Sequence, residues 1–308
     1  FCKAEDGIRS SPVTGVQTCA LPIYAQIKGL EYLTEPDKFV PVERGNPLPY
    51  KLPPEKLKSA GMTRESWRLE VLPDPGSNSQ VERPLRVADG TALTFDALMK
   101  LAEKHSVRFL KTMTCNNIAA PLGTGLWEGV PLREAIWMAK PTSNVRRVWF
   151  YGYHNEDPKQ EFRGSLSVGR VLEDPPDTPP VILCYKLNGD WISGNRGGPV
   201  RMVIPESYGF KNIKWLSHLY LTNEWKANDT YGERNNDVDS PLKTFCDPFP
   251  LPASVKPGQP IPVTGYAQVG ISGLKGVQVW IHNNAEKLPP DDEYFLKAPW
   301  RDARILPP

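Results

Sequence analysis

The chain has 308 residues, of which 40% are hydrophobic and nine are tryptophan, so it holds enough apolar material for one large or two medium domains. A net charge of only +2 argues against a nucleic-acid partner, and no apolar run is long enough for a membrane span. The 33 prolines, about twice the usual share, disfavour long helices and favour short strands and loops.

Residues 1–23 differ from the rest of the chain. They lack hydrophobic periodicity, and VTGVQTCALPI at 13–23 reads like the translation of a DNA-sequencing adapter. A signal peptide would need a basic start and a continuous apolar centre, and neither is present. We therefore expect residues 1–23 to be a non-native artefact, with the native N-terminus and any export signal missing.

Three cysteines remain once Cys2 and Cys19 are set aside with that segment: Cys115, Cys184 and Cys246. They are too widely separated for a disulfide framework, and no close Cys/His pair accompanies them. A structural zinc site is therefore not expected.

The chain is Pro-rich and irregular over 24–60 and becomes regular from Trp67. The alternation in WRLEV predicts a strand. Residues 84–105 then predict a short strand, a turn at Asp89-Gly90, and a helix with Thr94 as its N-cap. The apolar face of that helix predicts ordinary core packing.

The run from Val107 to Met113 predicts a strand that ends at Cys115. A Gly/Pro-rich stretch follows, which predicts a loop, and then the helix LREAIWMA, with Pro131 near its start. A cysteine at the tip of a strand can present its sulfur to a pocket mouth. The alternative is a buried structural thiol, because free Cys is among the most buried residue types.

Further on, 145–153 predicts a strand, 154–180 a polar loop region, and VILCYKLNG at 181–189 a strand that ends in a hairpin signal. The block RGGPVRMVIPESYGFKNIKWLSHLYLTN follows. Its Arg201 and Lys214 lie between apolar strands. Cations in such a setting are better explained by a buried anion than by surface solvation, since a phosphate needs guanidinium and ammonium donors.

Two stretches together resemble one family. MTC with WEGVPLREAI is similar to the molybdenum-ligand segment of the sulfite oxidase family of molybdopterin-dependent oxidoreductases. The second block resembles that family's HGxPxRxxxPxxxGxxxxKWL pattern, matched by Gly198, Pro199, Arg201, Pro205, Gly209, Lys214, Trp215 and Leu216. The resemblance covers roughly 30–300 and implies an α+β fold: a mixed α/β molybdopterin-binding domain over 24–245, followed by part of a second domain.

The resemblance also implies a molybdenum–pyranopterin cofactor with the thiolate of Cys115 on the metal. The cofactor-binding candidates that it gives are Arg44, Asn46, Cys115, Arg196, Arg201, Asn212, Ile213 and Lys214. Arg196 stands where the family usually has histidine. Arg44 and Asn46 precede the Pro-x-Pro motif at 47–49, where the family also has a histidine that this chain lacks. The expected catalytic residues are Cys115, Arg44 and Tyr231, the last fitting the family's substrate-site tyrosine after a one-residue shift.

From about Phe249 the composition changes to short alternating strands, at 261–266 and 277–281, with Gly/Pro turns. This pattern predicts an immunoglobulin-like β-sandwich. Residues 246–308 are fewer than the roughly 100 of a complete domain of this type, so we expect it to be truncated. In the family such a domain often mediates dimerisation, which implies a homodimer.

The resemblance implies two-electron oxygen-atom transfer, with sulfite oxidation as the first expectation and reduction of a sulfoxide or related oxide as the alternative. Electrons would pass to a separate partner such as a cytochrome c, and the protein would be bacterial and periplasmic. A hypothesis from another class is a non-catalytic, β-rich binding or adhesion protein. The sandwich-like C-terminus, the proline content and the shortage of acid/base residues support that reading.

Overall fold

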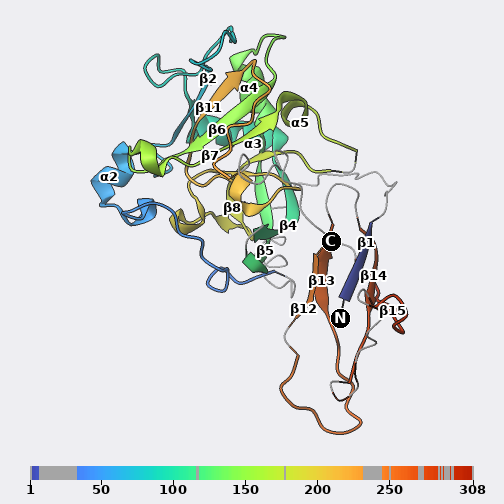
Figure 1. The fold of residues 1–308 in the computed structure, drawn as a ribbon. Helices are drawn as coiled ribbons and strands as arrows, with labels where there is room; N and C mark the ends of the chain where they lie inside the picture. Colours follow the sequence, from blue (N-terminus) through green and yellow to red (C-terminus); the bar gives the residue numbers. More distant parts are fainter. Residues whose placement is uncertain are drawn as a thin grey trace. The chain divides into compact units, whose positions relative to one another are not determined.

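The computed structural model of the chain describes residues 2–6, 33–115, 118–176, 178–231, 245–249, 251–269, 274–283, 285, 287, 292 and 295–306. The chain forms two compact units, one of residues 16–240 and one of residues 1–15 with 241–308. Figure 1 shows the ribbon of the chain, with the elements of both units labelled.

Antiparallel strands form the first sheet of the larger unit, in the order β10-β8-β5-β4, with β9 paired to β8. Its strands are β4 (Val107–Cys115), β5 (Ile118–Pro131), β8 (Ile182–Leu187), β9 (Asp190–Trp191) and β10 (Arg201–Val203). The predicted hairpin at Asn188-Gly189 is confirmed, since both residues have positive φ and join β8 to β9.

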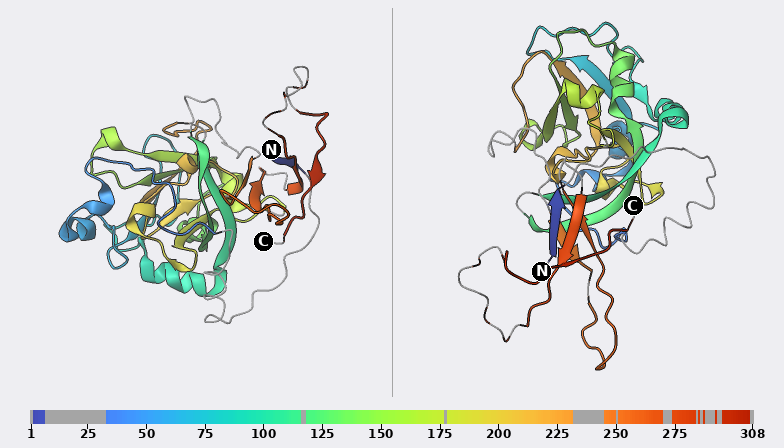
Figure 2. Two further views of the ribbon diagram at one scale, coloured as in Figure 1. Left: turned by 90° about the horizontal axis from the view of Figure 1, so that it is seen from below. Right: turned by 90° about the vertical axis from the view of Figure 1, so that its right-hand side faces the viewer.

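The prediction of a loop after Cys115 is wrong, because most of that stretch is the long strand β5, which Figure 2 shows in green. Its glycines do not break the strand; they let neighbours approach the backbone. At Gly123, a Cβ would lie 2.3 Å from the Phe39 ring. At Gly129, it would lie 2.4 Å from the carbonyl oxygen of Leu183.

The second sheet has the order β3-β2-β11-β6-β7. Its strands are β2 (Arg68–Pro73), β3 (Leu93–Thr94), β6 (Arg147–Gly152), β7 (Arg163–Ser167) and β11 (Leu216–Thr222). β2 and β11 are parallel, and the other pairs are antiparallel. The region predicted as a polar loop, 154–180, in fact contains β7 and the short helix α5 (Val168–Leu172), because Gly164, Ser165 and Leu166 are buried against β6.

Four short α-helices complete the described part of this unit: α2 (Pro54–Ser59), α3 (Phe95–His105), α4 (Leu132–Ala139) and α5. The predicted cap of α3 is confirmed, as Thr94 Oγ1 accepts from the amide of Ala97 at 3.1 Å. The one-turn 3-10 helices are η1 (Pro49–Lys51), η2 (Pro158–Gln160), η3 (Gly194–Arg196) and η4 (Gly209–Lys211). Among the described residues, no helix has the length and apolar character to cross a bilayer.

A hydrophobic cluster lies behind the β4–β5–β8 part of the first sheet and supports the end of β4. Phe39, Met113, Leu122 and Trp127 belong to it, and the Phe39 and Trp127 rings meet edge to face at 6.4 Å. Cys184 also belongs to this cluster and is fully buried, as the structural reading of a free thiol predicts. Within the described part of the chain, this cluster therefore contains Cys184 and leaves Cys115 outside it.

The smaller unit contains β1 (Cys2–Asp6), β14 (Leu274–Val279) and β15 (Arg301–Asp302) in one antiparallel sheet, and β12 (Phe245–Pro248) with β13 (Gly265–Gln268) in another. The two strands predicted at 261–266 and 277–281 are shifted to β13 and β14. The immunoglobulin-like sandwich stays a prediction, as does the foreign origin of residues 1–23, which contain β1. Cys246 is disulfide-bonded, a bond that the cysteine spacing had not predicted.

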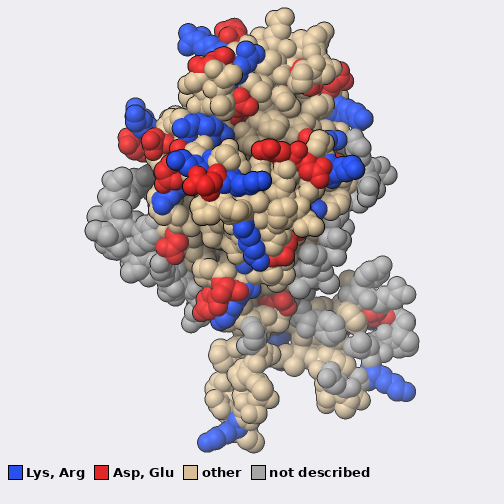
Figure 3. Space-filling view, turned by 90° about the vertical axis from the view of Figure 1, so that its left-hand side faces the viewer, with Lys and Arg blue, Asp and Glu red and all other residues tan. Residues whose placement is uncertain are grey.

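On the face drawn in Figure 3, basic and acidic residues are interspersed, and the described residues show no broad field of one sign there. This distribution agrees with the small net charge of the sequence.

Candidate functional site

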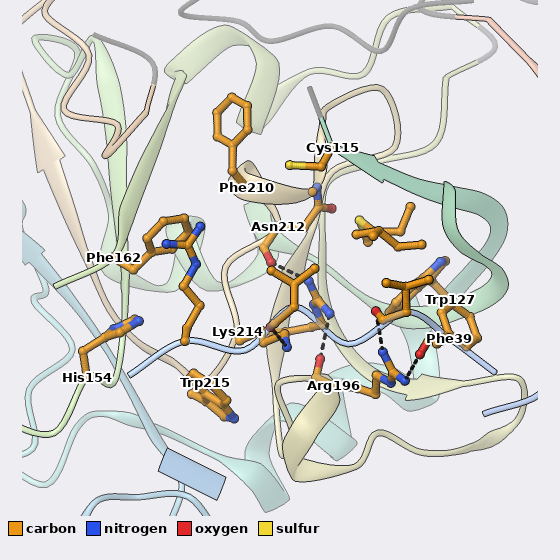
Figure 4. Close-up of a pocket in the computed structure, with 17 residues that line it drawn as sticks. Phe39, Cys115, Trp127, His154, Phe162, Arg196, Phe210, Asn212, Lys214 and Trp215 are labelled. Atoms are coloured by element: carbon orange, nitrogen blue, oxygen red, sulfur yellow. Dashed lines mark hydrogen bonds between the residues drawn. The ribbon is translucent and has the colours of Figure 1, made fainter. Parts of the chain in front are cut away.

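The end of β4, the N-terminal segment (residues 33–48) and the chain between β10 and β11 enclose a pocket (Figure 4). Seventeen residues line it. They include Cys115, which is half-buried. The β4–β5 register shifts between Met113 and Cys115, so Cys115 lies where regular pairing stops. The structure therefore places Cys115 at a strand end and in the pocket lining, while its role as a metal ligand stays a prediction.

Three cations from separate segments line the same pocket: Arg196 at the end of η3, Arg201 on β10 and Lys214 before β11. Arg201 is only 5% exposed. Its guanidinium donates to the carbonyl oxygens of Arg196 at 2.7 Å and Asn212 at 2.5 Å. In the view of Figure 4, Lys214 and Arg196 lie on the opposite side of the pocket from Cys115 and Phe210.

The hydrogen-bond acceptors of these cations are backbone carbonyl oxygens, which hold a cation less strongly than a carboxylate would. Lys214 Nζ donates to the carbonyls of Val42 at 2.9 Å and Asn195 at 2.7 Å. Arg196 donates to the carbonyl of Phe39 at 2.7 Å. The Nε atoms of Arg196 and Arg201 are buried and have no hydrogen-bond partner within the described part of the chain. Buried donors left over in this way fit an anionic group that is rich in oxygen acceptors.

The pKa values of Lys214 and Arg201 also indicate that the pocket lacks negative charge. Burial first, and then repulsion from Arg201, Arg196 and Arg44, lower the pKa of Lys214 to about 7. Burial also lowers the pKa of Arg201 to about 10, despite the nearby Cys184 thiol. A bound dianion would reverse the repulsion and favour the charged lysine.

Gly197 allows the Lys214 side chain to pack directly against the backbone beside the pocket. Its φ is +102°, and a Cβ there would lie 2.8 Å from the Lys214 side chain. Another residue type would therefore be strained and would displace Lys214. Glycine at this position is part of the stretch that carries the sequence resemblance.

Arg44 lines the pocket on the side of the N-terminal segment and contacts Tyr231. Its Nη1 donates to the hydroxyl of Tyr231 at 2.7 Å. The guanidinium also stacks over the rings of Phe162 at 4.1 Å and Tyr231 at 4.9 Å. The structure thus brings together two residues 187 positions apart that the sequence resemblance had assigned to one substrate site.

Two of the predicted cofactor residues do not line the pocket, and a third lines it with its side-chain amide bonded to the backbone. Asn46 is exposed and does not line the pocket; its backbone amide donates to Gln160 Oε1 at 2.7 Å. Ile213 is fully buried outside the lining. Asn212 does line the pocket, but its side-chain amide bonds to the backbone of Ile204 and Tyr208, so it shapes the wall from behind.

The sequence had not predicted His154, which lines the pocket and is 7% exposed. Its Nδ1 lies 2.9 Å from the carbonyl oxygen of Gly152. Burial is the largest influence on its pKa and lowers it, and Arg44 adds to that effect. A single histidine in a polar stretch carries no positional signal, so only the fold could bring it to the pocket.

A buried lysine on β4 was also missed. Lys111 is 3% exposed, and its Nζ donates to the carbonyls of Pro205 at 2.9 Å and Ser207 at 2.7 Å. Burial lowers its pKa to about 7. Lys111 thereby fixes the turn that leads into η4, which carries two lining residues, Gly209 and Phe210. The described residues hold no cluster of three or more His, Cys, Asp and Glu suited to a metal ion.

Comparison with known proteins gives a family match over residues 57–230 to "Oxidoreductase molybdopterin binding domain". An NADPH nitrate reductase of Beauveria bassiana is 31% identical over 106 residues, covering 34% of this chain and 11% of that protein. An NAD(P)H nitrate reductase of Betula pendula is 31% identical over 194 residues, covering 59% and 21%. The mitochondrial sulfite oxidase of Drosophila melanogaster is 25% identical over 188 residues, covering 54% and 32%.

Among solved structures, the sulfane dehydrogenase SoxCD of Paracoccus pantotrophus matches with a TM-score of 0.44 and 17% identity, over 72% of this chain and 58% of that one. The chain spans between 11% and 32% of the length of the three curated relatives named above.

Proposed function

The chain belongs to the oxidoreductase molybdopterin-binding domain family, to which sulfite oxidase is related, and from that membership we propose that it catalyses two-electron oxygen-atom transfer on a small oxyanion, with sulfite as the substrate. One observation carries the proposal. The same pocket has a cysteine thiol on one side and a group of cations on the other, and the buried Nε atoms of Arg196 and Arg201 have no hydrogen-bond partner among the described residues.

The residues present fit a molybdopterin cofactor. The thiolate of Cys115 suits a sulfur-rich, high-valent metal as a ligand. Arg201, Arg196 and Lys214 supply the donors that a pterin and its phosphate need. When bound, the molybdenum centre would supply the two-electron exchange of an oxygen atom with the substrate. This chain binds and orients the cofactor.

Recognition of the substrate falls to the Arg44–Tyr231 couple. Stacking on Phe162 and the bond to the tyrosine hydroxyl hold the Arg44 guanidinium in one orientation, with donors left for an anion. Because the pKa of His154 is lowered, the positive charge at this end of the pocket is carried by Arg44. The related proteins are named for reactions on sulfite and nitrate, which are both small oxyanions.

Reduction of a sulfoxide or related oxide is the second candidate. The lining near Cys115 includes the side chains of Met113, Leu122 and Phe210, so this part of the pocket wall is apolar. Such a wall favours an organic substituent over a bare oxyanion. The N-terminal artefact, the homodimer, the cytochrome-type electron acceptor and the periplasmic location remain proposals alongside.

Molybdenum content tests the enzyme class. Protein from a host that makes molybdopterin should contain near-stoichiometric molybdenum by plasma mass spectrometry, and Cys115→Ser should lose sulfite oxidation by at least about 100-fold, because the ligand thiolate is gone. Cys184→Ala is the matched control, since that thiol is buried outside the pocket. A folded parent without molybdenum would contradict the enzyme reading and favour a binding protein.

Substrate assays separate the two candidates. Oxidation of sulfite with ferricyanide or cytochrome c as acceptor supports the first, and reduction of dimethyl sulfoxide with reduced viologen supports the second. Tyr231→Phe and Arg44→Met should each raise KM for sulfite more than they lower kcat, because both hold the anion before reaction. A KM unchanged in both variants would remove the couple from the substrate site.

A further inference from the structure

A fully buried ion pair lies behind the pocket wall. Lys211 Nζ is 2.6 Å from Asp229 Oδ1, and both side chains are 0% exposed. The other ion pairs among the described residues keep partial exposure. A pair removed this completely from water carries a desolvation penalty that its attraction offsets only with good geometry and further hydrogen bonds.

Those further bonds come from β7 and β6. Ser165 Oγ donates to the second oxygen of Asp229 at 2.6 Å, and the Ser165 carbonyl accepts from Lys211 at 2.7 Å. Arg147 donates to Ser165 Oγ at 3.0 Å. One buried network therefore joins η4, the second sheet and the chain that follows β11.

The two members of the pair are close in sequence to residues at the pocket. Lys211 directly follows Phe210, which lines it, and Asp229 lies two residues before Tyr231, whose hydroxyl accepts from the lining residue Arg44. The rings of Phe210 and Tyr231 meet at 6.0 Å. The amide of Thr230 donates to the carbonyl of Arg163 at 3.0 Å, so the chain reaches Tyr231 already bound to β7. Displacing Asp229 would therefore move the hydroxyl that holds Arg44.

Stability alone does not account for such a pair, because well-packed apolar residues in its place are often as stabilising or more so. We propose that Lys211 and Asp229 are positioning residues that fix Tyr231, and through it Arg44, at the substrate side of the pocket. The proposal rests on the proposed function, in which that couple binds the anion. Neither residue lines the pocket itself.

The test replaces both members of the pair, so that neither Lys211 nor Asp229 remains as a buried charge without the other. Lys211→Met with Asp229→Leu should fold with a Tm near that of the parent and keep its molybdenum. We expect KM for sulfite to rise about tenfold, with kcat changed less than about threefold, because ground-state orientation of the anion is lost. Arg170→Met with Glu206→Gln is the matched control: that pair is also largely buried but does not line the pocket, so KM should stay at the parent value.

A mutant cycle with Tyr231→Phe distinguishes positioning from general loosening. If the pair acts through Tyr231, the apolar pair adds little to KM once the hydroxyl is gone, and the effects are strongly non-additive. Additive effects, or an unchanged KM in the apolar-pair variant, would overturn the proposal.

Hydrogen exchange needs no turnover, so it tests the positioning role even if the proposed function is wrong. In hydrogen-exchange mass spectrometry, exchange of 225–231 should rise in the apolar-pair variant, while exchange of β2 stays at the parent rate. If the parent does not oxidise sulfite, this result still supports the positioning role, and only the substrate assignment fails. Unchanged exchange at 225–231 would refute the positioning role whatever the substrate.

Discussion

Single residues in the pocket show which properties the sequence could predict. Cys115, Arg201 and Lys214 were predicted because their chemistry is uncommon in their local context, a thiol at a strand tip and cations between apolar strands. His154 and Lys111 have no such context. Their importance comes from burial, which depends on contacts between residues far apart in the chain. Asn46 and Ile213 were predicted from register alone, and the fold turns them away from the pocket.

Lys214 should leave a measurable mark on stability. Its pKa is lowered to about 7 from the ordinary value of 10.5, mainly by burial and then by Arg201 and its neighbours. Between those two values the unfolded chain binds more protons at this position than the folded chain, so the free energy of unfolding rises with pH. Lys214→Met removes that contribution, and we expect the Tm of cofactor-free protein to rise less steeply over that window.

The measurement is a series of thermal melts across the window for parent, Lys214→Met and Lys58→Met, the last being an exposed lysine on α2. The Lys58 variant should follow the parent. Lys111 has the same sign of shift, so some slope persists in every variant. Equal slopes in the parent and the Lys214 variant would contradict the burial-induced shift.

Among the elements, capped helices and hairpins with strong turn signals were predicted well, because their signals are local. The Thr94 cap and the Asn188-Gly189 turn are examples. β5 was missed because its glycines and prolines lower strand propensity, and the compensation comes from packing partners outside the strand. Phe39, more than 80 residues earlier, is one such partner, and local pattern cannot indicate it.

The close packing of Phe39 on β5 predicts the effect of adding a side chain at one of its glycines. Gly123→Ala should destabilise the larger unit by about 1–3 kcal/mol, because the new methyl would overlap the Phe39 ring and push the N-terminal segment outward. Gly90→Ala is the control, since it also has positive φ but open space around its Cβ position. Urea unfolding of both variants distinguishes steric overlap with Phe39 from backbone strain. An equal loss of unfolding free energy in the two variants would show that backbone strain alone destabilises Gly123→Ala.

In the whole molecule, the residues that line the pocket all lie between Phe39 and Trp215, inside the larger compact unit. Tyr231 and the Lys211–Asp229 pair belong to the same unit. The family match, 57–230, falls within it as well. The cofactor site therefore draws no described side chain from the smaller unit.

That separation predicts the outcome of removing residues 1–23. Because β1 pairs with β14 and contributes no pocket residue, a chain of 24–308 should keep the molybdenum content and KM of the parent. The deletion leaves one edge of β14 unpaired, so we expect more self-association at high concentration, which light scattering can follow. Arg201→Met in the full chain is the comparison and should lose molybdopterin, because its buried guanidinium lines the pocket. Loss of molybdenum in the shortened chain would show that residues 1–23 support the cofactor site.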